Sequence, residues 1–214
     1  MIAIETNTRS PSKTSSRPAL EIRFQFVDGS SETFIQPDAE AAEVIRQRTN
    51  SSNLFTQSRI VVADDYSKSV FVCAQVNRVD LVFNGSGHSR IPVDHYDLVE
   101  LTEAEFHQCV PLNDLDLLQR RDRQLKVGDL MVSFLHLKMK GGCHVYLMRE
   151  ALVKLPAESQ SFMQRFLSRG TYGIRLREGG HGLLNLQNLI GYTVYPGVPE
   201  LPADTWMAQP KVVR

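Results

Sequence analysis

Cys143, His144 and His181 are the residues whose types could support covalent catalysis. A cysteine nucleophile needs a histidine that takes its proton and an Asn or Asp that orients the ring, and Asn185 could supply that group. No local motif marks any of them, and an isolated cysteine usually packs in a core. A hydrolase with its site near Cys143, His144 and His181 is therefore the alternative to a non-enzymatic function.

Other catalytic and cofactor motifs are missing from the sequence. The run Gly85-Ser-Gly-His88 lacks the Gly-x-Ser-x-Gly spacing of a nucleophile elbow, so we expect Ser86 to lie in a turn. Neither a Gly-x-Gly-x-x-Gly loop nor a phosphate-binding P-loop is present. The sequence predicts no cofactor.

Zinc ligands usually come from closely spaced histidines and cysteines. Adjacent residues of a strand point to opposite faces, and residues two apart in a helix do not share a face. These rules count against the pairs that the sequence offers, namely Cys143 with His144, His107 with Cys109 in a predicted helix, and the looser His88 with His95. We predict no metal site.

The densest basic cluster lies within residues 113–126. Arg120, Arg121, Arg123 and Lys126 could contact phosphates. Aspartates are interspersed among them, and no aromatic residue is present to stack on bases. A solvated helix face is the preferred interpretation, and binding of RNA or single-stranded DNA is a third alternative.

Four side-chain amides lie between apolar strands, at Gln75, Asn77, Gln187 and Asn188. Such amides usually bond the backbone of a turn. In a gapless alignment of two similar segments, Gln75 and Gln187 occupy equivalent positions. The four amides could therefore line a shared binding groove instead.

The composition excludes several classes of protein. The 214 residues are 42% hydrophobic, which is enough for one large core or two small ones. Basic and acidic residues number 24 each, so no global field attracts nucleic acid or an anionic membrane. Three scattered cysteines, no signal-peptide pattern and no apolar run of roughly 20 residues predict a soluble cytoplasmic protein without disulfides.

A repeated pattern organises the chain. Residues 71–85 and 183–197 each read as a strand, a polar Gln/Asn step, a second strand and a closing glycine. Each segment follows a predicted helix with proline at its start and a base near its end, at 37–50 and 156–170, and Phe166 falls on the apolar face of the second. We predict an α+β fold of two tandem small, mainly antiparallel β units, each in the order β-β-α-β-β-β, joined by a partly helical connector.

The predicted boundaries are a disordered tail at 1–18, a first unit at 19–86, a connector at 87–128, a second unit at 129–197 and an extended tail at 198–214.

The C-terminal tail carries the only tryptophan, Trp206, among prolines. Packing of Trp206 on its own protein is the favoured expectation, and a free Trp206 that meets a partner is the other. For the whole chain we predict a non-enzymatic regulatory or scaffolding module that binds another protein through sheet edges, the groove between the units or this tail. The candidate binding residues are Gln75, Asn77, Gln187, Asn188 and Trp206.

Overall fold

The computed structural model describes residues 18–49, 54–64, 66–83, 98–110, 126–152 and 168–195, together with Phe166, Trp206 and Ala208. Several predicted features lie outside the described residues: the N-terminal tail apart from Pro18, Ser86, His88, His95, Arg120, Arg121 and Arg123.

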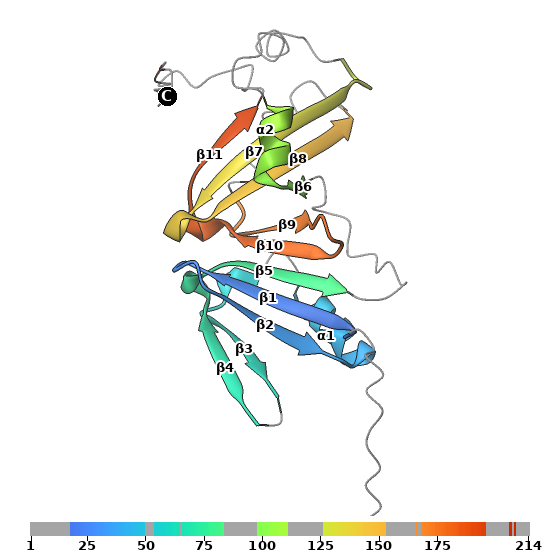
Figure 1. The fold of residues 1–214 in the computed structure, drawn as a ribbon, viewed down its shortest axis with the longest axis vertical. Helices are drawn as coiled ribbons and strands as arrows, with labels where there is room; N and C mark the ends of the chain where they lie inside the picture. Colours follow the sequence, from blue (N-terminus) through green and yellow to red (C-terminus); the bar gives the residue numbers. More distant parts are fainter. Residues whose placement is uncertain are drawn as a thin grey trace, which may run out of the picture.

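The described chain has an α+β fold dominated by one large sheet (Figure 1). Its strands are β1 (Leu20–Phe26), β2 (Ser31–Gln36), β5 (Val76–Phe83), β6 (Leu98–Leu101), β7 (Leu130–Met139), β8 (His144–Leu152), β9 (Thr171–Arg175), β10 (His181–Asn185) and β11 (Leu189–Tyr195). They lie in the order β11-β7-β8-β6-β9-β10-β5-β1-β2, and every neighbouring pair is antiparallel except β6 with β9. A hairpin of β3 (Arg59–Ala63) and β4 (Lys68–Val72) forms a second, two-stranded sheet.

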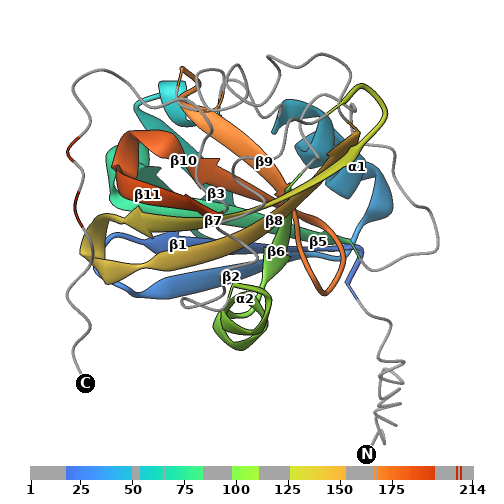
Figure 2. The ribbon, with the colours of Figure 1, turned by 90° about the horizontal axis from the view of Figure 1, so that it is seen from above.

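The expectation of two small sheets, one in each unit, was wrong, because strands of both units form one large sheet. β5 pairs with β1 on one side and with β10 on the other, so strands of the first and second units share one ladder. Every residue of β5 except Phe83 is buried, as expected of an interior strand with neighbours on both sides. Seen from above, the strands curve around the interior of the molecule (Figure 2).

Alternating side chains of β5 reach two hydrophobic clusters on opposite faces of the sheet. Val79 and Leu81 pack in one cluster with Phe24 of β1, and Val82 packs in the other with Leu184 of β10. We call these the β1 cluster and the β7 cluster, because they also contain the inward residues of β1 and β7. A third cluster forms where α2 covers β7 and β8.

Two α-helices are described, and each begins after a residue whose side chain caps it. α1 (Ala39–Arg48) begins after Asp38, whose carboxylate accepts a hydrogen bond from the Ala41 N–H at 2.7 Å. α2 (Glu103–Cys109) has a reciprocal capping box between Thr102 and Glu105. Among the described residues, no helix has both the length and the apolar content needed to cross a bilayer.

The two halves of the sheet share an arrangement of strands. β1 lies between β2 and β5, and β7 lies between β8 and β11. A short 3₁₀ turn precedes the last strand of each set, η2 (Cys73–Gln75) before β5 and η4 (Leu186–Asn188) before β11. Each last strand also carries a register shift at its beginning.

Candidate functional site

The β3-β4 hairpin extends from one end of the molecule, outside the large sheet (Figure 1). Asp64 fixes its turn, because the carboxylate accepts hydrogen bonds from the N–H groups of Tyr66 and Ser67 at 2.7 and 2.5 Å. Ile60 and Val62 pack on the β1 cluster, which holds the hairpin against the body of the protein.

Among the described residues, no strand lies beside the outward edge of β3. The Asp64 N–H donates to the Ser67 carbonyl at one end of the hairpin, and the Cys73 N–H donates to the Ser58 carbonyl at the other end. In an antiparallel pair, hydrogen-bonded and non-hydrogen-bonded positions alternate, so every second residue between these two ends bonds the opposite strand. Ile60 and Val62 therefore bond β4. The N–H and C=O groups of Arg59, Val61 and Ala63 point away from it, towards the free edge of β3.

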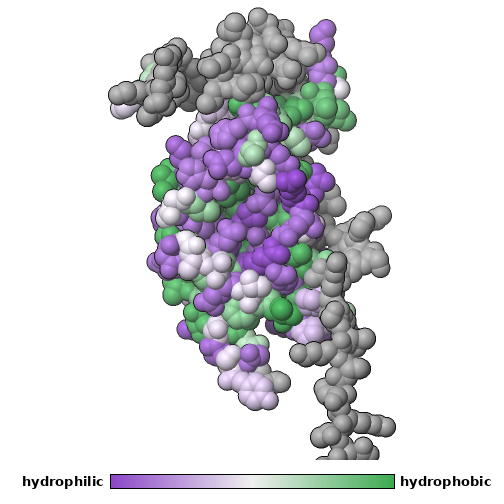
Figure 3. Space-filling view, viewed as in Figure 1, coloured by the Kyte–Doolittle hydropathy of each residue, from purple (hydrophilic) through white to green (hydrophobic). Residues whose placement is uncertain are grey.

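The outer face of the hairpin is apolar. Val61, Val70 and Val72 are 47%, 48% and 56% exposed, and Val61 lies directly opposite Val70 in the register. Arg59 and Lys68 stand at the two ends of this face. In Figure 3 the middle of the visible face is mainly hydrophilic, and hydrophobic surface appears on the lower part of the molecule.

A cavity of about 460 Å³ runs along the free edge of β3. All five residues of β3 line it, and no residue of β4 does. Its floor is formed by the β1 cluster and its other wall by the end of α1, which lies on the β3 side of the hairpin (Figure 1). The described lining residues outside β3 are Ile22, Phe24, Ile45, Arg48, Thr49, Leu54, Gln57, Val79 and Leu81. We call this cavity the β3 groove, and its size is in the range of ligand sites.

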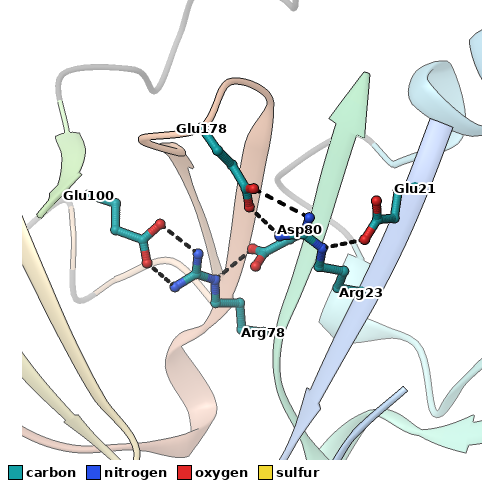
Figure 4. A network of polar contacts seen from close by, with 6 residues as sticks. All are labelled: Glu21, Arg23, Arg78, Asp80, Glu100 and Glu178. Carbon is teal, nitrogen blue, oxygen red and sulfur yellow. Dashed lines mark hydrogen bonds and ion pairs between the residues drawn. The ribbon is translucent and has the colours of Figure 1, made fainter. Parts of the chain in front are cut away.

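An ionic network crosses the large sheet on the face opposite the β1 cluster (Figure 4). Arg78 of β5 binds Glu100 of β6 through two nitrogens and donates from Nε to Asp80 at 2.6 Å. Arg23 of β1 binds Glu178 in the β9-β10 turn and donates from Nε to Glu21 at 2.6 Å. Each of these charges already has a partner, and none of the six residues lines the β3 groove. The network ties strands together and offers no open site.

The predicted amides fall into two groups. Asn77 and Asn188 are buried, and Gln75 and Gln187 are exposed. Asn188 donates to the carbonyls of Ala74 and Val76 at 3.2 and 3.0 Å.

Most of the other hydrogen bonds of these side-chain amides are also made to backbone carbonyls. Asn77 donates to the Lys140 carbonyl at 2.8 Å, and Gln187 donates to the Phe55 carbonyl at 3.5 Å. Lys140 Nζ in turn donates to the Asn188 side chain at 3.0 Å. These contacts join the 3₁₀ turns of the two halves and occupy the junction between them.

The proposed catalytic residues do not converge. Cys143 packs against the β7 cluster, whereas His181 lies on β10 in the same direction as Leu183, which belongs to the β1 cluster on the opposite face. His144 pairs with His136, with Nδ1 and Nε2 2.8 Å apart.

The ionisation of these groups is equally unsuited to nucleophilic attack. Burial raises the pKa of the Cys143 thiol, which disfavours the thiolate. Burial, together with the charge of Arg46, lowers the pKa of His181 to about 4. Cys143 lines a cavity of about 340 Å³ in which it is the only titratable group among the described residues.

The other predicted residues lie apart from the β3 groove. His107 and Cys109 are in α2, as expected, and within the described part of the chain no group of three or more His, Cys, Asp or Glu side chains could hold a metal ion. Trp206 is 94% exposed, so the favoured expectation that it packs on the body was wrong. Lys126 is exposed, and its N–H bonds the Asp129 carboxylate at 3.1 Å.

No motif in the sequence marks Arg48, Arg59 or Val61. The alternation of SRIVVA predicted a strand at 58–63, and the acidic start and basic end of α1 were also readable. The hairpin's position outside the large sheet was not readable, because it depends on which strands pair over long distances. Comparisons with models of protein families, with curated proteins and with solved structures found no match to this chain.

Proposed function

We propose that this protein is a non-enzymatic binding module that takes up an extended segment of another polypeptide along the free edge of β3. The observation that carries the proposal is the β3 groove, in which α1 forms one wall and β3 the other, with outward backbone groups that pair with no described strand. A segment laid in such a groove becomes an added strand, since its backbone can bond the outward groups of Arg59, Val61 and Ala63.

The floor of the groove favours a partly apolar segment. Ile22, Phe24 and Leu81 line it, so alternate side chains of an added strand would meet apolar surface. Burial of apolar side chains is worth about 25 cal/mol for each Å² removed from water. Main-chain bonds along β3 would supply affinity, and the fit of alternate side chains would supply selectivity.

The junction between the halves is a weaker candidate for the same role. Asn77, Asn188 and Lys140 bond one another or the backbone there, so an incoming ligand would have to replace those bonds. The separation of Cys143 from His181 on opposite faces also favours a binding function over hydrolysis.

We also infer that the halves are two structural repeats. Supporting this, β1-β2 and β7-β8 are hairpins whose first strands also pair with β5 and β11, and a 3₁₀ turn precedes each of these last strands. Val76 lies opposite Phe26 and Leu189 lies opposite Met139, which makes Asn188 the counterpart of Gln75, one residue later than in the gapless sequence alignment. The β9-β10 hairpin then corresponds to β3-β4, which alone stays outside the large sheet.

A pair of proline substitutions tests strand addition. Random peptides of about ten residues are selected on the immobilised full chain, and the affinity of a selected peptide is measured by calorimetry. Val61→Pro removes an N–H that points to the groove without removing a bond to β4. We expect Val61→Pro to weaken binding by at least about tenfold, because a ladder bond is lost and the ring obstructs the edge.

Val70→Pro is the matched control. Val70 lies opposite Val61, and its N–H points away from β3, at the other edge of the hairpin. Its substitution should leave the affinity unchanged. The proposal is wrong if no peptide is selected, or if Val61→Pro binds the selected peptide as tightly as the wild type.

A further inference from the structure

Two guanidinium groups line the β3 groove. Arg48 is in the last turn of α1, and Arg59 is the first residue of β3, so they approach the groove from its two walls. The end of a helix carries partial negative charge, which favours a cation at the position of Arg48.

Neither arginine has a partner among the described residues. Both lack an ion pair and a side-chain hydrogen bond within the described ranges, and none of the described residues lining the groove is acidic. Other arginines of the protein do bind carboxylates. Arg23, Arg46, Arg78 and Arg177 each pair with a glutamate.

The two arginines give the groove a local positive charge. Both side chains are exposed, so a single ion pair with either one contributes at most about 1 kcal/mol, or about fivefold in affinity. Basic and acidic residues balance over the whole chain, so the net charge of the protein adds no long-range attraction to that of the two arginines. A cationic segment would be repelled here.

The direction of the side chains indicates where the acidic residues of the segment fall. Arg59, Val61 and Ala63 share the outer face of β3, and Ile60 and Val62 share the face that packs on the β1 cluster. A strand added beside β3 alternates in the same way, so its inward side chains meet the apolar floor and its outward ones lie beside Arg59.

We propose, resting on the strand addition above, that the partner segment of the β3 groove is acidic and amphipathic, with apolar residues alternating with Glu or Asp. The guanidiniums of Arg48 and Arg59 bind its carboxylates through charge-assisted hydrogen bonds, for which arginine's planar fork is suited. Charge complementarity therefore selects the partner, and main-chain pairing along β3 holds it.

Three matched peptides test this inference on the full chain. They are capped octapeptides with a fluorescent label, in which valine alternates with Glu, Gln or Lys, and binding is followed by fluorescence anisotropy. We expect the Glu peptide to bind at least about tenfold more tightly than the Gln peptide at low salt, with the difference shrinking as salt screens it. The Lys peptide should bind most weakly.

Single substitutions locate the charge effect. Arg48→Gln and Arg59→Gln should each weaken binding of the Glu peptide by about two- to fivefold and leave the Gln peptide unchanged. Arg175→Gln, at an exposed position of β9, is the matched control and should change neither affinity.

The possible outcomes separate the two proposals. Equal affinity for the Glu and Gln peptides, or tighter binding of the Lys peptide, overturns the acidic selectivity while strand addition stands. Binding of none of the three, together with an empty peptide selection, overturns both. Displacement of the Glu peptide by an equimolar single-stranded oligonucleotide would assign the arginines to phosphates and would also overturn the acidic-segment proposal.

Discussion

Burial shifts the pKa of several ionisable side chains in this protein towards the neutral form, among them Asp80, Cys143 and His181. The pKa of Asp80 is raised, because burial outweighs the attraction of its partner Arg78. Burial likewise raises the pKa of Cys143 and lowers that of His181, so each of these two groups favours its uncharged form. Arg48 and Arg59 differ from these interior groups, because they reach the groove charged and without a carboxylate partner among the described residues.

His181 should make stability depend on pH. Its folded pKa is about 4, whereas an unfolded histidine titrates near 6.5, so below about pH 6.5 the unfolded chain takes up a proton that the folded chain refuses. The contribution of His181 to stability is therefore present above the unfolded pKa and is lost as the pH falls towards 4. Between about pH 7 and about pH 5 we expect a loss of about 2 kcal/mol in the free energy of unfolding, measured in urea.

The variant His181→Gln should lose this part of the pH dependence. His107→Gln, on the exposed side of α2, is the control and should keep the wild-type dependence. An unchanged pH profile in His181→Gln would contradict the assignment.

At the scale of elements, residues close together in the chain decide where a helix begins, and long-range packing decides which of its side chains are buried. The Asp38 cap of α1 lies one residue after Pro37, where the sequence predicts the helix start, and the capping box of α2 joins residues only three positions apart. The helix predicted at 156–170 lies mostly outside the described residues, but Phe166 is fully buried in the β7 cluster, with its ring 4.8 Å from that of Tyr172. Phe166, which the sequence places on the apolar face of that predicted helix, therefore lies in the core.

Phe166→Ala should destabilise the protein by about 3 to 5 kcal/mol, because it removes a large buried ring and leaves a cavity. Chemical unfolding followed by circular dichroism measures the change. Tyr66→Ala, in the exposed hairpin turn, is the control and should stay within about 0.5 kcal/mol of the wild type. A change near zero in Phe166→Ala would refute the packing of this residue.

At the scale of the whole molecule, turns from one half meet strands and turns of the other. The β7-β8 turn η3 (Lys140–Gly142) approaches the β1-β2 hairpin so closely that a Cβ at Gly141 would lie 1.4 Å from the Val27 carbonyl oxygen. Asn185 donates to the carbonyls of Cys73 and Val76 at 3.0 and 2.9 Å, which adds a second contact across the junction. These contacts connect the halves beyond the β5-β10 ladder.

Gly141→Ala should therefore cost about 3 kcal/mol or more, because the new methyl forces the turn away from Val27 in addition to straining a backbone with φ of 71°. Gly142→Ala is a matched control, with φ of 78° and no atom within 4 Å of the new Cβ. It should cost only about 1 kcal/mol, the strain of the positive φ. Urea unfolding compares the two variants, and equal costs would contradict the close approach.

The sequence by itself determined the α+β class, and the turns and helix caps that build it are local features. These features depend on residues close together in the chain, such as Asp64 in its turn or Thr102 with Glu105. Local preference and alternation carry enough information for such features. The sequence also predicted that the four amides bond the backbone around turns. Asn77 and Asn188 do bond backbone carbonyls, but those carbonyls belong to Lys140 and Val76, far away in the chain, so only the tertiary structure decides these contacts.

Only the tertiary structure decided which strands pair and which edges stay free. The β5-β10 ladder joins residues about a hundred positions apart, and its register depends on how two hydrophobic clusters fill opposite faces. The same packing leaves the β3-β4 hairpin outside the sheet and Arg48 beside Arg59 in the groove. The candidate site consists of a strand edge and two arginines that have no partner among the described residues. Whether such groups are paired depends on which elements pack beside them, and the fold of the whole chain sets this.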